Sequence, residues 1–480
     1  MYFLNIVNSS STNYIDKFRR ILMKKTVIAL AVATSLTLSF TSVQASTSAN
    51  ASHHQSSEQT VLKKINAEKI YQDIAYLSKK PRVAGTEAER EAATFVQKRL
   101  SKLGYESAVE PFTFTGYTPA ASFSLSVNGT SYSPTTFTYS TNGNVTAEIV
   151  DGGLGTKDNL ANKDVTGKIV LVQRGTITFG EKVLNAAEKG AAAVIIFNNT
   201  DGELNGTLGG ANDNYIPSLA VTKEEGEKIL TSIQKGEKPS GTVKIEGAVV
   251  SERTSYNVTA TKPSTFKKKG TNDIIVVGAH HDSVAGAPGA NDDASGTAMV
   301  LELARVFKTL PTDTELRFVT FGAEEVGLLG SEHYVSELSE DEKNRIVGMF
   351  NLDMVGSRDA GDLVMNTADG TPNLVTELAQ ASSTRLNGSP TPFQAGGRSD
   401  HVPFAEAGIP AALFIHSPSE PWYHTPEDTL DKISKEKLQD VAEIVGTAIY
   451  DRSRPDQQGS SVKKKATFKA PHLYHEQDVK

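Results

Sequence analysis

The sequence has 480 residues, a formal net charge of -7, 38% hydrophobic residues and 22% charged residues. These values exclude a disordered chain, a collagen or a coiled coil, and the length leaves room for two or three folded domains. Cysteine is absent, which excludes disulfides and thiolate sites, so any metal must bind to His, Asp or Glu. Because the chain is acidic and has no dominant basic stretch, we expect no nucleic-acid partner.

The first 45 residues have the pattern of a secretory signal. Residues 23–25 include two lysines, residues 26–40 are uncharged and mostly apolar, and Ala45 ends a segment with small side chains. The apolar run is shorter than the ~20 residues that a membrane-spanning helix needs. We therefore predict a secreted, extracellular protein with no membrane partner once residues 1–45 are removed.

Two amphipathic helices are predicted after a polar linker. Ile70, Ile74 and Leu77 recur at helical spacing in the first. Thr86 followed by Glu89 is a capping-box pattern at the start of the second, whose apolar stripe runs to residue 103. We expect both helices to pack on a core.

From about residue 122 the chain becomes rich in Thr, Ser, Tyr and Gly with short alternating runs, which is typical of strands and turns. We predict a strand over 167–175, a helix over 181–189 and a strand over 191–197. The stretch from about 125 to 250 resembles the protease-associated domain that many secreted peptidases carry as an insertion. The resemblance implies a lid or substrate-access role, and a passive insertion is the alternative.

After residue 251, predicted strands alternate with predicted helices. The strands cover 274–279, 316–322, 349–354 and 411–415, and apolar stripes indicate helices near 300–307 and 438–449. This alternation predicts an α/β fold with a mainly parallel mixed sheet sandwiched by helices. In such sheets ligands bind at the carboxyl ends of the strands, which is where the polar clusters fall.

Five polar clusters follow these strands or lie between them. They are Ala279-His280-His281-Asp282-Ser283, Asn291-Asp292-Asp293-Ala294-Ser295-Gly296, Glu324-Glu325-Val326-Gly327, Asn351-Leu352-Asp353-Met354-Val355-Gly356 and Trp422-Tyr423-His424-Thr425-Pro426-Glu427-Asp428. In extended backbone His280 and Asp282 point to the same side, so Asp282 can accept a hydrogen bond from the ring nitrogen of His280 that is not bound to metal. Two histidines and three carboxylates suffice for two zinc ions that share one acid, with cobalt or manganese as substitutes.

Each cluster also has an ordinary structural interpretation. His281 can simply pack, the adjacent acids Asp292 and Asp293 can cap the helix that follows them, and the paired glutamates of the third cluster can be solvated. Asp353 is harder to explain in this way, because a charge inside an apolar strand is costly unless it is paired or binds a metal.

Together with Arg82-Val83-Ala84-Gly85-Thr86 and Ser399-Asp400-His401, the clusters resemble in order and spacing the secreted bacterial double-zinc aminopeptidases of the leucine type. The resemblance covers roughly residues 60–452. It implies that His280 and Asp353 hold one zinc, that Glu325 and His424 hold the other, and that Asp292 bridges them. It also implies that Glu324 is the general base and that Asp282 orients His280.

The resemblance further implies hydrolysis of the first peptide bond of substrates with a free N-terminus. Acids near the metals, Asp353 and Glu324, would hold the substrate's amino group. Bulky apolar N-terminal residues are the expected preference, and basic ones are a second expectation. Arg398 either helps to bind the substrate or forms a structural ion pair, and Tyr423 either lines the substrate pocket or packs. We expect a monomer.

The predicted organisation is an upstream segment and signal peptide (1–45), a first peptidase part (60–124), the inserted domain (125–250), a catalytic part (251–452) and a polar tail (453–480). Three other functions stay open. A zinc carboxypeptidase would need a basic residue such as Arg398 or Arg358 to bind a terminal carboxylate, and a glutaminyl cyclase of similar fold would use a single zinc. A wall-associated binding module would use the inserted domain and the lysines at 463–465.

Overall fold

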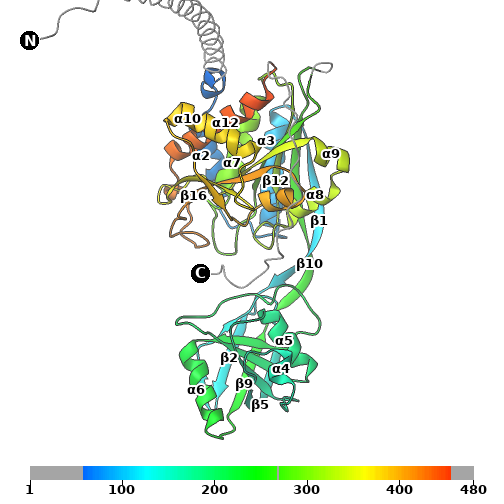
Figure 1. Ribbon diagram of the computed structural model, residues 1–480, viewed down its shortest axis with the longest axis vertical. Coiled ribbons are helices and arrows are strands. Elements are labelled where there is room, and N and C mark those ends of the chain that lie inside the picture. Colours follow the sequence, from blue (N-terminus) through cyan, green and yellow to red (C-terminus); the bar gives the residue numbers. More distant parts are fainter. Residues whose placement is uncertain (1–57, 267–269, 456–480) are drawn as a thin grey trace, which may run out of the picture.

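The structure is a computed structural model that describes residues 58–266 and 270–455. Two bodies are joined by a long two-stranded ribbon (Figure 1). The predicted signal segment and the lysines at 463–465 lie outside the described residues. Among the helices of the described ranges, none is both long and apolar enough to cross a membrane.

The larger body is built on an eight-stranded mixed sheet. In spatial order its strands are β1 (Glu106–Thr118), β10 (Val249–Lys262), β12 (Glu315–Phe321), β11 (Ile274–His280), β13 (Ile346–Leu352), β16 (Ala411–Ser417), β14 (Asp362–Thr367) and β15 (Phe393–Ala395). The four central strands, β12, β11, β13 and β16, are mutually parallel. Antiparallel β10 and β14 flank them. The predicted α/β fold with a mainly parallel mixed sheet is therefore confirmed.

Helices cover both faces of this sheet (Figure 1). One face packs against α2 (Ala67–Leu77), α3 (Glu87–Lys102), α7 (Ala294–Phe307), α10 (Leu374–Asn387) and α12 (Lys435–Ser453). The other face packs against α8 (Leu329–Glu337) and α11 (His401–Glu406), and α9 (Glu340–Arg345) leads into β13. Because the sheet is covered on both sides, its central strands are apolar at consecutive positions such as Val276 and Val277, which are fully buried.

Two details of the larger body differ from the sequence predictions. The prediction of a capping box is wrong, because the Thr86 side chain makes no capping hydrogen bond at the start of α3. Glu89 instead accepts hydrogen bonds from the Gly85 amide at 2.6 Å and from the Ser255 hydroxyl on β10, so it is not available to the helix end. The prediction that Asp353 lies inside a strand is also wrong, because β13 ends at Leu352 and Asp353 is the residue that follows.

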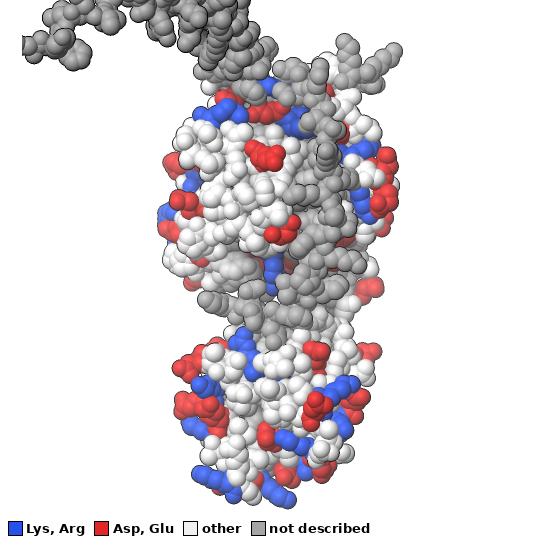
Figure 2. Space-filling model, in the orientation of Figure 1, with Lys and Arg blue, Asp and Glu red and all other residues white. Residues whose placement is uncertain are grey.

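The smaller body contains a second eight-stranded sheet. Its spatial order is β3 (Thr130–Tyr132), β2 (Ser122–Val127), β9 (Ser240–Glu246), β5 (Gly143–Asp151), β6 (Ile169–Gln173), β7 (Ala193–Phe197), β8 (Ser218–Val221) and β4 (Thr135–Thr136). Helices α4 (Lys157–Leu160) and α5 (Phe179–Glu188) cover one face, and α6 (Lys223–Gln234) covers the other. On the side drawn in Figure 2, acidic and basic side chains are interspersed over this body.

The ribbon places the smaller body on a defined side of the large sheet. It consists of β1 and β10, paired from Glu106 opposite Thr261 to Thr118 opposite Val249. Only the last part of β10 pairs with β12, starting where Val258 lies opposite Thr320. Since β12 ends at Phe321, residues 249–256 project beyond its carboxyl end. The smaller body therefore lies toward the edge where the polar clusters were predicted.

The packing of β12 gives a stability prediction. Phe318 is fully buried in the core beneath the helices and meets the ring of Tyr105 edge-on at 5.7 Å. Phe318→Ala should lower the free energy of unfolding by about 3–5 kcal/mol, because it leaves a cavity that the sheet cannot close. Phe266→Ala, at a position 37% exposed, is the control and should change it by less than about 0.5 kcal/mol. Urea denaturation measures both, and equal losses would contradict the assignment of this core.

Candidate metal centre

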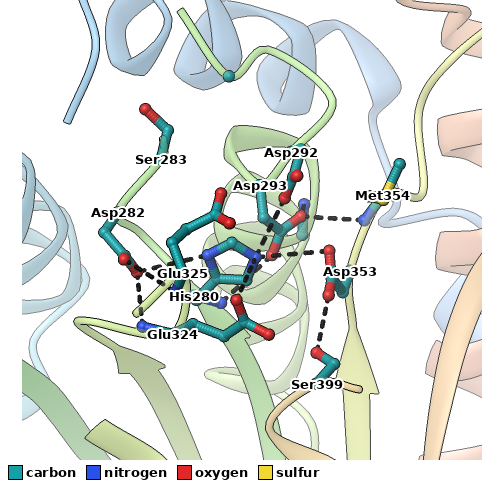
Figure 3. A network of polar contacts seen from close by, with 12 residues as sticks. His280, Asp282, Ser283, Asp292, Asp293, Glu324, Glu325, Asp353, Met354 and Ser399 are labelled. Carbon is teal, nitrogen blue, oxygen red and sulfur yellow. Dashed lines mark hydrogen bonds and ion pairs between the residues drawn. The ribbon is translucent and has the colours of Figure 1, made fainter. Parts of the chain in front are cut away.

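The predicted ligands converge at the carboxyl edge of the parallel strands. His280 is the last residue of β11, the paired glutamates follow β12, Asp353 follows β13, and His424 lies in the loop after β16. Asp292 comes from the loop before α7. Figure 3 shows the side chains of His280, Asp292, Glu324, Glu325 and Asp353 turned toward one another.

Asp292 lies at the middle of the cluster. Its Oδ1 is 3.2 Å from Nε2 of His280, and its Oδ2 is 3.1 Å from Nε2 of His424. Each oxygen of one carboxylate thus faces a different histidine. This arrangement suits a carboxylate that spans two cations.

Each histidine has a second carboxylate beside it. Asp353 Oδ1 is 3.5 Å from His280 Nε2, and Glu325 Oε2 is 3.0 Å from His424 Nε2. The cluster therefore divides into two halves that share Asp292. The grouping by distance is not strict, because ligand atoms of His280, Asp292 and Glu325 also lie within 4.8 Å of one another.

The donor atoms fit zinc. Bonds of about 2.0–2.2 Å in a tetrahedral site leave two ligand atoms of one zinc roughly 3.3 Å apart, which matches the separations of 3.0 to 3.5 Å between the imidazole nitrogens and carboxylate oxygens. In addition, Glu325 Oε1 and Asp353 Oδ1 are buried and have no hydrogen-bond partner among the described residues. Imidazole and carboxylate together are also a donor set that zinc accepts readily.

The protonation of the cluster reflects its excess of negative charge. Burial raises the pKa of Glu325 to about 7, and the charge of Asp292 adds to this. Burial opposes the charged form of His424, but its hydrogen bonds to Asp292 and Glu325 outweigh this and raise its pKa to about 10. In the protein alone, protons on the histidines therefore offset the charge of the carboxylates. Bound cations would replace those protons.

Glu324 is placed differently from the other carboxylates. Its Oε2 is 4.0 Å from His280 Nε2, farther than the carboxylates of Asp292 and Asp353. Burial raises the pKa of Glu324 well above 4.5, the charge of His280 opposes this rise, and the carboxylate of Asp400 adds to it. A raised pKa makes a carboxylate a stronger proton acceptor.

Asp282 holds the turn that carries both glutamates. Its Oδ1 accepts a hydrogen bond from the Glu324 amide at 3.1 Å, and its Oδ2 accepts one from the Glu325 amide at 3.2 Å. The same Oδ1 is 3.4 Å from Nδ1 of His280. One carboxylate therefore lies against three residues of the cluster.

Asp293 has the helix-capping role that was one interpretation of the adjacent acids Asp292 and Asp293. Its Oδ1 accepts hydrogen bonds from the amides of Gly296 at 2.8 Å and Met354 at 3.2 Å, and its Oδ2 accepts one from the His280 amide at 3.2 Å. Asp293 therefore caps α7 and ties it to two strand ends, while Asp292 faces the histidines. The capping interpretation therefore applies to Asp293, and Asp292 stays the candidate metal ligand.

Ser399 is a contact of the cluster to which the sequence analysis gave no role. Its hydroxyl donates to Asp353 Oδ2 at 2.7 Å and accepts a hydrogen bond from Asn351 Nδ2 at 2.7 Å. The only signal in the sequence was its place in the motif Ser399-Asp400-His401. His281, by contrast, is buried with Nδ1 3.1 Å from Thr320 Oγ1 on the neighbouring strand, as its packing interpretation predicts.

The two candidate substrate-binding residues lie at the rim. Tyr423 is 43% exposed, and its ring stacks on His424 with 3.7 Å between the ring centres. Burial of its hydroxyl and the nearby charge of Asp292 raise the pKa of Tyr423, so it stays protonated and can donate a hydrogen bond. Trp422 donates instead to Asp359 Oδ2 at 2.9 Å. Arg398 is exposed, one residue before Ser399.

Comparison with known proteins gives two family matches. Residues 257–449 match the model of peptidase family M28, and residues 145–229 match the PA domain. Aminopeptidase YwaD of Bacillus subtilis is 38% identical over 95% of this chain and its own full length. The solved structure of an aminopeptidase from Aneurinibacillus sp. strain AM-1 is 55% identical, covers 83% of this chain and 97% of its own, and superposes with a TM-score of 0.80. The structure of BSAP, a zinc aminopeptidase from Bacillus subtilis, is 38% identical over 82% of this chain and 97% of its own, with a TM-score of 0.66.

The central position of Asp292 gives a prediction about metal content. Asp292→Asn keeps the size of the side chain but removes its charge, so it should weaken binding in both halves of the cluster at once. Metal analysis after dialysis against a chelator should show both zinc ions lost from this variant under conditions in which the wild type retains them. Asp213→Asn, at an exposed position of the smaller body, is the control with the same charge change. Unchanged zinc stoichiometry in Asp292→Asn would overturn the bridging assignment.

Proposed function

The chain belongs to peptidase family M28, and from this premise we propose that the cluster around Asp292 is the two-zinc site of an enzyme that removes N-terminal residues from peptides. It is a zinc-dependent metallo-aminopeptidase with an inserted PA domain. The observation that carries the assignment of the site is the position of Asp292, with one oxygen facing His280 and the other facing His424.

Each proposed ligand follows from a contact of the cluster. His280 and Asp353 would hold one zinc, Glu325 and His424 would hold the other, and Asp292 would contribute one oxygen to each. Zinc bound there would polarise the scissile carbonyl and favour deprotonation of the attacking water. Asp282, 3.4 Å from Nδ1 of His280, would keep the imidazole turned so that Nε2 faces the metal.

Glu324 is the proposed general base. Its carboxyl lies beside the half formed by His280 and Asp353, but at 4.0 Å from His280 Nε2 it pairs less tightly than the proposed ligands do. We infer that it takes a proton from the attacking water and passes it to the nitrogen of the leaving amine. The raised pKa of Glu324 suits the first step, because it strengthens the carboxylate as a proton acceptor.

The acidity of the pocket accounts for the requirement for a free N-terminus. A protonated or hydrogen-bonded amino group would lie against Asp353 and Glu324, both of which are buried, and an internal peptide bond has no such cation. The exposed ring of Tyr423 offers apolar surface to the first side chain, which supports bulky apolar residues as the preferred substrates and basic ones as a second choice. Arg398 stays a candidate for substrate contact.

We also propose that the enzyme is secreted after removal of residues 1–45 and acts as a monomer. All five proposed ligands come from one chain, so the site needs no partner subunit. The proposed division of the chain is that of the sequence analysis, with the inserted domain at about 125–250. A substrate-access role for this domain is supported by the ribbon of β1 and β10, which carries it toward the edge of the sheet where the ligands lie.

The role of Glu324 can be tested by changing its chemistry alone. Glu324→Gln should retain zinc near the wild-type content but lower kcat by at least about 100-fold, because it removes a proton carrier. Turnover of leucine p-nitroanilide and metal analysis provide the two measurements. Glu337→Gln, at an exposed position of α8, is the control for the loss of one acid. A Glu324→Gln enzyme that kept most of its rate would refute the assigned role.

A second test asks whether the enzyme removes residues from the N-terminus or from the C-terminus of a peptide. A peptide such as Leu-Gly-Gly should lose its first residue, while the N-acetylated copy should stay intact, because acetylation removes the charge that the acidic pocket would bind. Chelation should abolish hydrolysis of the free peptide, and added zinc should restore it. Release of the last residue from the acetylated copy would instead indicate a carboxypeptidase.

A further inference from the structure

Asp428 is a buried carboxylate next to the cluster that none of the assigned roles uses. It lies four residues after His424 and is 1% exposed. Its Oδ1 accepts a hydrogen bond from the Asn291 amide at 2.8 Å, and its Oδ2 accepts one from the Asp292 amide at 3.0 Å. Its carbonyl oxygen accepts a third from the Ala290 amide at 3.2 Å. Three successive amides of the Asp292 loop thus donate to one residue.

The loop that carries Asp428 is itself held in a fixed shape. The Thr425 amide donates to the Trp422 carbonyl at 3.0 Å, and the Asp428 amide donates to the Thr425 carbonyl at 3.2 Å. The first turn contains His424, and the second links it to Asp428 through a short stretch of chain. A contact from Asp428 to the Asp292 loop therefore also fixes the distance between that loop and His424.

The opposite side of the Asp292 loop is held as well. Asn291 donates from Nδ2 to Glu420 Oε1 at 2.7 Å and accepts at Oδ1 from the Gly356 amide at 2.9 Å. The buried guanidinium of Arg82 donates to the Gly289 carbonyl at 2.9 Å. The hydrogen bonds from the Asn291 and Asp292 amides to Asp428 add to these contacts and reach Asp292 itself.

A carboxylate suits these two amides better than an amide side chain would. Each N–H group reaches a different oxygen of Asp428, whereas Asn would place an acceptor oxygen toward one N–H and an NH₂ group toward the other. The charge has a cost, since Asp428 lies close to the carboxylate of Asp292, and a second buried negative charge is unfavourable. A group kept at this cost is better explained by what it positions than by packing alone.

We propose that Asp428 is a positioning residue that keeps the carboxylate of Asp292 aligned with the imidazole of His424. It thereby sets the zinc affinity of the half formed by Glu325 and His424, and the rate of the reaction. The inference rests on the proposed function, because it takes Asp292 and His424 as ligands. It adds a residue that touches neither metal nor substrate but governs the distance between two ligands that are far apart in the chain.

The test compares Asp428→Asn with Glu427→Gln. The first variant keeps the size of the side chain but turns an amide NH₂ toward a backbone N–H, while the second makes the same charge change at the exposed neighbouring position. Zinc titration with a competing chelator should show one of the two zinc ions bound at least about 10-fold more weakly in Asp428→Asn. At saturating zinc its kcat should fall about 10-fold with KM within about twofold, and Glu427→Gln should match the wild type in all three quantities.

A double variant separates positioning from general stability. If Asp428 acts through Asp292, adding Asp428→Asn to Asp292→Asn should weaken zinc binding no further. Additive losses would overturn the proposal, and so would an Asp428→Asn enzyme that is less stable but has wild-type zinc affinity and kcat once loaded. If instead Asp292→Asn alone left zinc binding intact, the proposed ligand set would fail first, and the role of Asp428 would fall with it.

Discussion

The repulsion among buried carboxylates is the constraint on which this structure depends. Ligand atoms of Asp292 and Glu325 lie within 4.8 Å of each other and of His280, and so do those of Glu324 and Asp353, in a largely buried pocket. Burial raises the pKa of Glu324 and of Glu325, and neighbouring carboxylate charges add to both rises. Such a cluster would spread apart unless its backbone were fixed from behind, or unless cations entered it. The fold fixes the backbone, and bound zinc would supply the cations.

The fold fixes the cluster with a second group of carboxylates that point at backbone amides. Asp282 accepts from the two glutamates, Asp293 from His280 and from the residue after Asp353, and Asp428 from Asp292. The backbone N–H groups partly neutralise these acids, so they add less repulsion than free carboxylates would. Each also joins two chain segments that leave different strands. The proposed ligands therefore hold their places as members of one network.

The strands and the polar residues at their ends could be predicted from the sequence because both depend on local patterns. An apolar run followed by a short polar motif indicates a strand end, and parallel strands bring their ends together. The contacts it missed span long distances in the chain. Asp428 meets Asp292 from 136 positions away, and Ser399 meets Asp353 from 46 positions away, so no local pattern could pair them. Glu89 misled the capping prediction for the same reason, since its partner Ser255 belongs to a distant strand.

The strand that carries the inserted domain also holds part of the turn that contains Glu324 and Glu325. Asn257 of β10 accepts from the Gly322 amide at 3.3 Å and donates to the Gly330 carbonyl at 2.8 Å, so it spans both ends of the segment that contains Glu324 and Glu325. A β-carbon at Gly322 would lie 2.3 Å from the Ser255 hydroxyl and 2.6 Å from Glu89 Oε1, which leaves this segment no room to shift on its own. The inserted domain is therefore attached through residues that the site needs in place. A movement of the ribbon large enough to bend β10 at these positions would also move the proposed base, whereas bending nearer residue 250 would leave it undisturbed.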